Sequence, residues 1–141
     1  MNVQVTHIHI PEVTIYYADF GDQSLLAEDQ IALLDELHDL LLNDNGLCSV
    51  VLNLGGVKPI PNAKAHSKKL IDLMMSKPKY VGSVMLNADV FMKMIIKLVE
   101  TKLDFSDGLG LAPRKTFFAK TIKEAQDLIV ELSSNLEASA V

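Results

Sequence analysis

The sequence predicts an α/β protein in which a mixed five-stranded sheet is covered by four helices. Short runs rich in β-branched and aromatic residues alternate with longer segments whose apolar residues recur at helical spacing. The first two β-like runs are separated by a short turn, which is typical of an antiparallel pair. Later strands alternate with helices, as in parallel sheets with helical crossovers. The expected order of elements is ββαβαβαβα.

The opening hairpin consists of two strands, at 2–10 and 13–18. Residues 2–10, "NVQVTHIHI", alternate in polarity, and residues 13–18, "VTIYYA", are β-branched and aromatic. Pro11 and Glu12 turn the chain between them. We therefore expect these two strands to pair antiparallel.

The first helix and the third strand follow. Apolar residues at helical spacing predict a helix from about Leu25 to Leu42. We expect Asn45 and Gly46 to end it, because both residues tolerate the left-handed conformation of a helix C-cap. The continuous apolar run at 47–54, "LCSVVLNL", predicts a strand that is covered on both faces.

Two further helix–strand units complete the central part of the chain. Asn62 is the expected N-cap of a helix that runs to about Ser76, and the next strand is "YVGSVML" at 80–86. A third helix is expected from about Val90 to Lys102, followed by a loop rich in glycine and proline. The segment "KTFFAK" at 115–120 predicts the last strand.

The C-terminal helix has a sequence signal for its start. Thr121 and Glu124 have the spacing of a capping box, which predicts a helix that extends to about Ser134. We expect residues 135–141 to form a frayed tail.

The length and composition are those of one globular domain that spans residues 1–141. The chain has 141 residues, of which 49% are apolar. The single cysteine, Cys48, allows no internal disulfide and suggests a reducing compartment. No signal peptide and no run long enough for membrane insertion are visible, so we expect a cytoplasmic protein.

Charge is distributed unevenly along the chain. The net charge is −5, yet the residues before Lys58 include nine acids and no lysine or arginine. The remainder has 13 basic and nine acidic residues, a net charge of +4. Such asymmetry indicates either a face that docks a partner or two halves that complement each other within the fold. The few basic residues are not interleaved with aromatic ones, so nucleic acid is not an expected partner.

The start of the second helix is the candidate anion or ligand site. Two glycines in the preceding loop let the backbone approach another group, and a helix N-terminus attracts negative charge. The candidate residues of this site are Gly55, Gly56, Asn62, Lys64 and His66. The alternative is a solvated surface in which the glycines only form the turn.

The third expected helix is apolar around most of its circumference. Its polar residues Lys93, Lys97 and Glu100 form a narrow stripe, whereas a helix at the surface of a sheet has a wide polar face. The cover of the apolar part is another helix of the chain, a second protomer or an apolar ligand. The candidate residues of this surface are Phe91, Met92, Met94, Ile95 and Leu98.

Catalytic and metal-binding patterns are weak. His7 and His9 lie two residues apart on one strand, but two ligands do not close a metal site, and we expect a partly exposed sheet edge instead. Asp19 and other loop carboxylates are expected to solvate turns. We find no nucleophile motif, and we expect no enzymatic activity, no cofactor and no metal.

Three segments carry a resemblance to a known family: "VTIYYADFGDQSLLAEDQIALLDELHDLL", "SVVLNLGGVKPIPNAKAHSKKL" and "RKTFFAKTIKEAQDLIVEL". In order and spacing, nearly the whole chain resembles the STAS domain, the anti-sigma factor antagonist fold, and its SpoIIAA-like branch, which is similar in outline to Sec14-like lipid-binding domains. The resemblance implies a SpoIIAA-like fold and a regulatory role.

The phosphorylation motif of that family is not preserved. Members that act as switches carry Asp-Ser-Ser/Thr-Gly at the start of the second helix. Counted from Asn53-Leu54, these positions hold Pro61, Asn62, Ala63 and Lys64, with Ala63 at the phosphoacceptor position. An alanine has no hydroxyl group, so the resemblance implies no phosphoacceptor here.

Together these observations predict a non-catalytic regulatory or protein-interaction module that binds a protein partner or a second copy. Its candidate contact surfaces are the third helix and the basic start of the second helix. The alternative is a carrier for an apolar, lipid-like small molecule, with or without an anionic head group. In a carrier, the third helix would line the pocket, and Lys64 or His66 would contact the head group.

Overall fold

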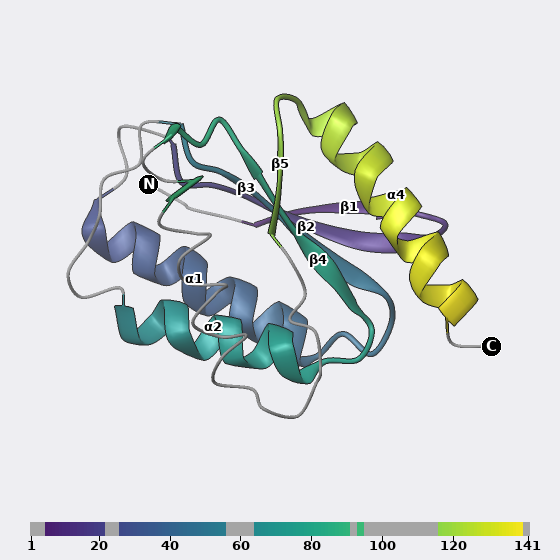
Figure 1. Cartoon of the computed structure of the whole chain (residues 1–141). Helices are drawn as coiled ribbons and strands as arrows, with labels where there is room; N and C mark the ends of the chain where they lie inside the picture. The colour runs from purple at the N-terminus through teal and green to yellow at the C-terminus, as the bar shows by residue number, and fades with distance from the viewer. Residues whose placement is uncertain (1–4, 22–25, 56–63, 91–92, 95–115, 140–141) are drawn as a thin grey trace.

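The computed structural model of the chain describes residues 5–21, 26–55, 64–90, 93–94 and 116–139. Five strands form one sheet in the order β1-β2-β3-β4-β5 (Figure 1). The pair β1–β2 is antiparallel and the other neighbouring pairs are parallel. The predicted mixed five-stranded sheet is therefore confirmed. The strand bounds are β1 Thr6–Ile10, β2 Val13–Asp19, β3 Cys48–Asn53, β4 Tyr80–Leu86 and β5 Thr116–Ala119.

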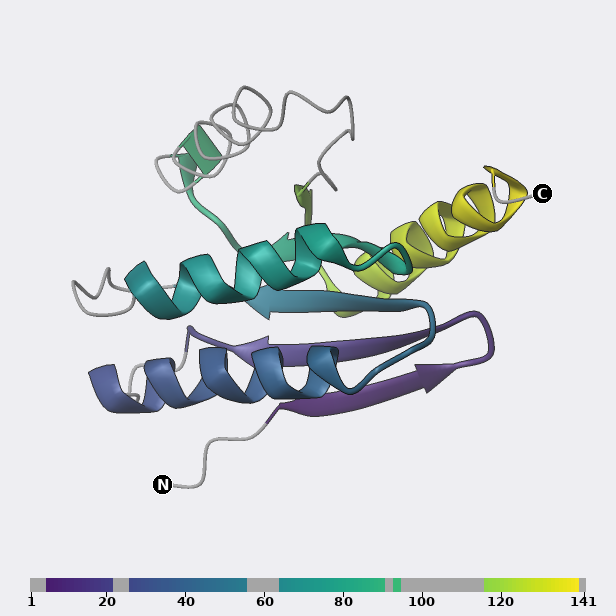
Figure 2. The ribbon, with the colours of Figure 1, turned by 90° about the horizontal axis from the view of Figure 1, so that it is seen from below.

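Three described helices cover the sheet. Helices α1 (Ala27–Leu42) and α2 (Lys64–Ser76) lie side by side on one face, and α4 (Ile122–Ser139) lies on the other (Figures 1 and 2). Most of the expected third helix falls outside the described residues. Its described beginning makes one helical hydrogen bond, in which the Lys93 N–H donates to the Asp89 carbonyl at 3.0 Å.

The sheet separates two apolar layers. The residues that pack between the sheet and the α1–α2 pair include Tyr16, Leu37, Val50, Leu70 and Tyr80. Those that pack between the sheet and α4 include Ile15, Val51, Val84, Ala125 and Ile129. The central strand β3 faces both layers, which explains its continuous apolar sequence.

A β-bulge in β4 creates a buried polar cluster. The register with β3 shifts so that Cys48 pairs with Tyr80 and Ser49 pairs with Gly82, whose φ is 153°. The Ser49 hydroxyl donates to the Gly82 carbonyl, and the hydroxyls of Tyr80 and Ser83 share a hydrogen bond. These partners satisfy polar groups that would otherwise be costly to bury.

Two predicted details of the helix ends were wrong. Helix α1 ends on Asn43 in a right-handed conformation, because its N–H and its side-chain amide both donate to the Asp39 carbonyl, so Asn45 and Gly46 do not form the cap. Helix α4 continues beyond Ser134 to Ser139, so the expected tail of residues 135–141 is helical up to that point. Leu136, Glu137 and Ala138 are good helix formers, which favours the longer helix, and fraying of residues 135–141 stays a prediction.

The predicted start of α4 is correct in position. The Glu124 N–H donates to the Thr121 hydroxyl at 3.1 Å, as expected for a capping residue. The Glu124 carboxylate accepts the Lys120 N–H at 3.0 Å, one residue earlier than in a regular capping box.

Candidate functional site

Three polar side chains meet where consecutive parallel strands end. Asp19 ends β2, Asn53 ends β3 and Asn87 directly follows β4. The Asn53 amide donates to the Asp19 carboxylate at 3.0 Å, and the Asn87 amide donates to the Asn53 side-chain oxygen at 2.9 Å. We call this hydrogen-bonded set the strand-end triad.

Backbone groups of the adjoining loops complete the strand-end triad. Asp19 Oδ1 also accepts the Gly21 N–H at 2.9 Å, and Asn53 Oδ1 also accepts the Gly55 N–H at 3.2 Å. The same oxygens therefore accept bonds from the neighbouring strand end and from the following loop. This arrangement connects both loops to the sheet.

The two loops touch at a pair of glycines. A Cβ atom on Gly21 would lie 2.3 Å from the Gly55 carbonyl oxygen and 3.1 Å from its nitrogen. The sequence predicted that Gly55 permits a close approach of the backbone, and in the structure it is Gly21 that comes close. Gly56, the second glycine of the prediction, lies outside the described residues.

Asn87 has an unusual backbone. Its φ is 59°, in the left-handed region that asparagine tolerates better than most other residues. This conformation turns the chain as it leaves β4. Asn87 therefore combines a left-handed backbone with a side chain that donates a hydrogen bond to Asn53.

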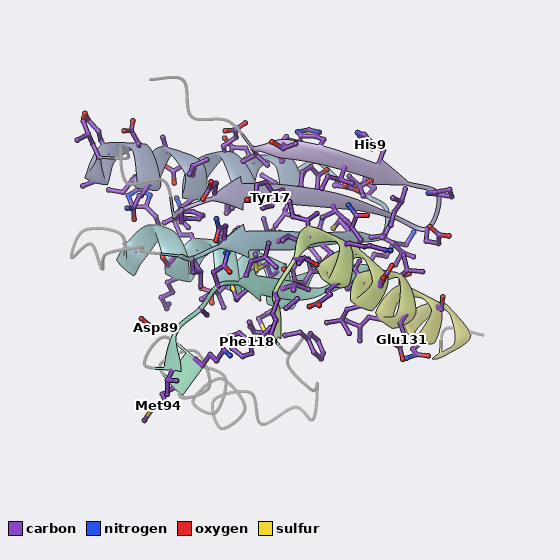
Figure 3. The ribbon with its side chains drawn as sticks, turned by 90° about the horizontal axis from the view of Figure 1, so that it is seen from above. His9, Tyr17, Asp89, Met94, Phe118 and Glu131 are labelled. Carbon is purple, nitrogen blue, oxygen red and sulfur yellow. The ribbon has the colours of Figure 1, made fainter. Side chains whose placement is uncertain are left out.

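Tyr17 on β2 (Figure 3) interacts with Asp19 and Asn53 of the strand-end triad. Burial raises the pKa of the Tyr17 hydroxyl, the Asp19 charge raises it further, and a hydrogen bond with the Asn53 side chain lowers it. The hydroxyl thus remains protonated at neutral pH. It offers a neutral donor beside the triad and not a phenolate base.

The predicted anion site is only partly within the described structure. Asn62 and Ala63 lie outside the described residues, and Lys64 is the first residue of α2. The His66 ring nitrogen Nδ1 lies 2.7 Å from a carboxylate oxygen of Asp35 on α1. His66 thus contacts an acidic group of the neighbouring helix.

The predicted apolar surface also lies partly beyond the described residues, which exclude Phe91, Met92, Ile95 and Leu98. Met94 is 60% exposed, and Val90, one helical turn earlier, is 75% exposed. The Lys93 ammonium lies 5.4 Å from the ring centre of Phe118 on β5, a cation–π contact between this segment and the sheet (Figure 3).

His7 and His9 lie on the edge strand β1, as predicted. Their ring centres are 5.9 Å apart, and His7 makes an edge-to-face contact with Tyr16 at 5.1 Å. In the described part of the chain, no group of three or more potential ligand side chains is placed to hold a metal ion. None of the described helices has the length and apolar character to cross a bilayer.

Sequence reasoning missed the strand-end triad. It assigned Asp19 to a solvated turn and did not bring the amides of Asn53 and Asn87 together with it. A signal existed, because each of these polar residues ends or directly follows a predicted strand, and the carboxyl ends of parallel strands lie at one edge of a sheet. The pairing itself depends on strand order, which adjacency in the sequence does not specify.

Neither the protein-family models nor the curated proteins contain a match to this chain. Among solved structures, the chain is similar to an anti-sigma-factor antagonist (STAS) domain protein from Planctomyces limnophilus. The similarity covers 89% of this chain and 97% of that chain, with 12% sequence identity and a TM-score of 0.47. The similar structure is that of a STAS domain protein, the family that the sequence pattern resembles. A similarity with this sequence identity and TM-score does not assign the chain to that family.

Proposed function

We propose that the chain is a non-catalytic regulatory module that binds another protein through the surface around Val90 and Met94. The observation that carries the proposal is the exposure of these two apolar side chains, at 75% and 60%, one helical turn apart. Adjacent exposed apolar side chains are a feature of surfaces that associate.

The sheet topology favours binding of a protein over small-molecule chemistry. In open α/β sheets, ligands bind where successive crossovers pass to opposite faces of the sheet. Here the crossovers through α1 and α2 lie on the same face. The polar side chains at the ends of β2 and β3 form hydrogen bonds with each other and with their own loops. Their role in this proposal is therefore structural.

Regulation in this proposal does not use phosphorylation at the position that the resemblance indicates. Ala63 stands there and has no hydroxyl group to accept phosphate. Control would come from occupancy of the apolar surface. The lone buried Cys48 fits the reducing compartment in which we place the protein.

Native mass spectrometry of the protein purified from its own host tests this function. We expect a protein complex without an additional small molecule. Met94→Asp should abolish the complex, because a carboxylate in an apolar contact is costly to desolvate. Ile122→Asp is the matched control, since Ile122 is an exposed apolar residue at the start of α4 and should leave the complex intact.

Two outcomes would contradict the proposal. A protomer that carries a few hundred extra daltons, released by organic solvent, would identify a carrier of an apolar molecule. A complex with another protein that survives Met94→Asp would place that contact elsewhere on the molecule.

A further inference from the structure

The uneven distribution of charge along the sequence places an acidic helix beside a basic helix on one face of the molecule. Helix α1 contains five acidic residues and no lysine or arginine, whereas α2 contains three lysines and one aspartate. Figure 2 looks onto these two helices, which lie next to each other. We call their exposed side the α1–α2 face; its exposed residues include Glu28, Asp35, Asp39, Lys68, Lys69 and Asp72.

Helix stability explains these charges only in part: Glu28 and Asp29 lie in the first turn of α1, where the helix dipole favours acids. Acidic residues are unfavourable near a helix C-terminus and basic residues near an N-terminus, because of the helix dipole. Asp39 lies in the last turn of α1, which has no basic residue. The lysines of α2 lie in its first half, and its first turn has no acidic residue. Asp39 of α1 and Lys64 of α2 are thus placed against the helix dipole.

Pairing within the chain explains these charges only in part. The α1–α2 contact has one described charge interaction, between His66 and Asp35, which is an ion pair only when the histidine is protonated. Lys68 is paired with Asp72 of its own helix at 3.7 Å. Neither Lys68 nor Lys69, the two lysines of α2 whose side chains the structure describes, forms an ion pair with an acid of α1. The acidic and basic ridges therefore lie beside each other and remain exposed.

We propose that a second copy of this chain docks on the α1–α2 face, so that the acidic ridge of each copy contacts the basic ridge of the other. A two-fold axis that runs parallel to the helices, between α1 and α2, produces this arrangement. Such an interface is self-complementary, because the same two ridges are used twice. The inference rests on the proposed role in protein interaction but uses a different surface from that around Met94.

The size and composition of the face set the strength of the dimer. At 1.5 Å per residue, α1 and α2 are roughly 24 and 20 Å long, so the contact belongs to the small interfaces of weak complexes. Leu42, which is 55% exposed, lies on the same ridge as Asp35 and Asp39 and adds an apolar contact. We therefore expect a weak dimer whose affinity falls as salt concentration rises.

Charge exchange provides the test. Sedimentation velocity of the full chain over a range of concentrations should show a monomer–dimer equilibrium at low salt that shifts to monomer at high salt. Asp39→Lys and Lys69→Glu should each weaken dimerisation about tenfold or more, because each substitution brings like charges together twice in a symmetric interface. The double variant Asp39→Lys/Lys69→Glu should restore dimerisation to within about threefold of the original, because the attraction is re-formed with its signs exchanged.

The choice of variants separates an effect on dimerisation from an effect on folding. Asp39→Lys favours the helix dipole, and Lys69→Glu changes an exposed residue beyond the first turn of α2, so neither should lower the melting temperature, and a loss of dimer cannot be attributed to unfolding. A chain that stays monomeric at low salt, or a double variant that does not recover, would overturn the inference. If Met94→Asp abolishes the dimer and the charge variants do not, the α1–α2 inference fails while the proposed function stands.

Discussion

The backbone of Gly21 lies so close to that of Gly55 that a methyl group on Gly21 would sit 2.3 Å from the Gly55 carbonyl oxygen. This contact joins the loop after β2 to the loop after β3. The strand-end triad lies in the same region, because the backbone N–H groups of both glycines donate to its oxygens. Small residues and polar side chains here act together to hold the carboxyl edge of the sheet.

Gly21→Ala should destabilise the protein, because the added methyl group would meet rigid backbone. Overpacking of this kind typically costs about 1–3 kcal/mol. Urea denaturation followed by circular dichroism measures the effect. Gly46→Ala is the matched control: the nearest atom to a Cβ there is an Asp44 side-chain oxygen at 3.6 Å, so the unfolding free energy should change little. Equal effects of the two substitutions would show that the Gly21–Gly55 contact is not restrictive.

Asn87 should tolerate glycine better than alanine. Its φ of 59° costs an alanine roughly 1 kcal/mol, whereas glycine adopts the same conformation freely. Both substitutions remove the hydrogen bond to Asn53, so the difference between them isolates the backbone effect. We expect Asn87→Ala to lower the unfolding free energy more than Asn87→Gly, again by urea denaturation. The opposite order would contradict the left-handed backbone at this position.

Removal of the Ser83 hydroxyl should leave the buried Tyr80 hydroxyl without its partner. An unsatisfied buried hydroxyl costs about 1–3 kcal/mol, so Ser83→Ala should be clearly destabilising. The combination Tyr80→Phe/Ser83→Ala removes both partners and should be less destabilised than the sum of the two single variants. Thermal unfolding of all four proteins in a double-mutant cycle measures this coupling. Additive effects would contradict the hydrogen bond.

Cys48 should make the protein less stable at alkaline pH. Burial, together with the nearby Asp44 charge, raises the pKa of the Cys48 thiol to about 11, with a partly opposing effect of Lys77. In the unfolded chain a thiol has a pKa near 8.5, so the unfolded state loses its proton first as the pH rises. The stabilisation is complete below the unfolded pKa and is lost as the pH rises toward the folded pKa.

The matched variant for this prediction is Cys48→Ala, which has no thiol to titrate. Between pH 8 and pH 10 the original chain should lose about 1–2 kcal/mol more unfolding free energy than this variant. Burial also raises the pKa values of Tyr16 and Tyr80, to which the Cys48 charge adds, and these two hydroxyls act mainly at higher pH. Parallel pH profiles of the two proteins would show that the thiol is not the titrating group.

Local sequence signals predicted the described elements well. The alternating and continuous apolar runs located the strands, and Thr121 located the start of α4. Errors occurred at helix ends, which local sequence signals locate less reliably than the elements themselves. Asn43 rather than Gly46 ended α1, because its own side chain could bind the Asp39 carbonyl.

The candidate sites were harder to predict than the fold. The close approach expected at Gly55 exists, but its partner, Gly21, is 34 residues away in the sequence. His66 was considered as an anion ligand, and the structure places it beside Asp35. In both cases the missing information was which helix or loop lies next to the residue. The apolar surface of the expected third helix stays a prediction, apart from the exposed Val90 and Met94.

The sequence by itself determined the order of strands and helices, the two-sided burial of β3 and the opposite charges of α1 and α2. These properties depend on periodicity and composition, which are local along the chain. Only the tertiary structure decided that Asp19, Asn53 and Asn87 bind one another, that Gly21 contacts Gly55, and that the acidic and basic helices lie side by side on one face. Those relationships depend on which strands become neighbours and on the register between them, and both are set by the packing of the whole sheet.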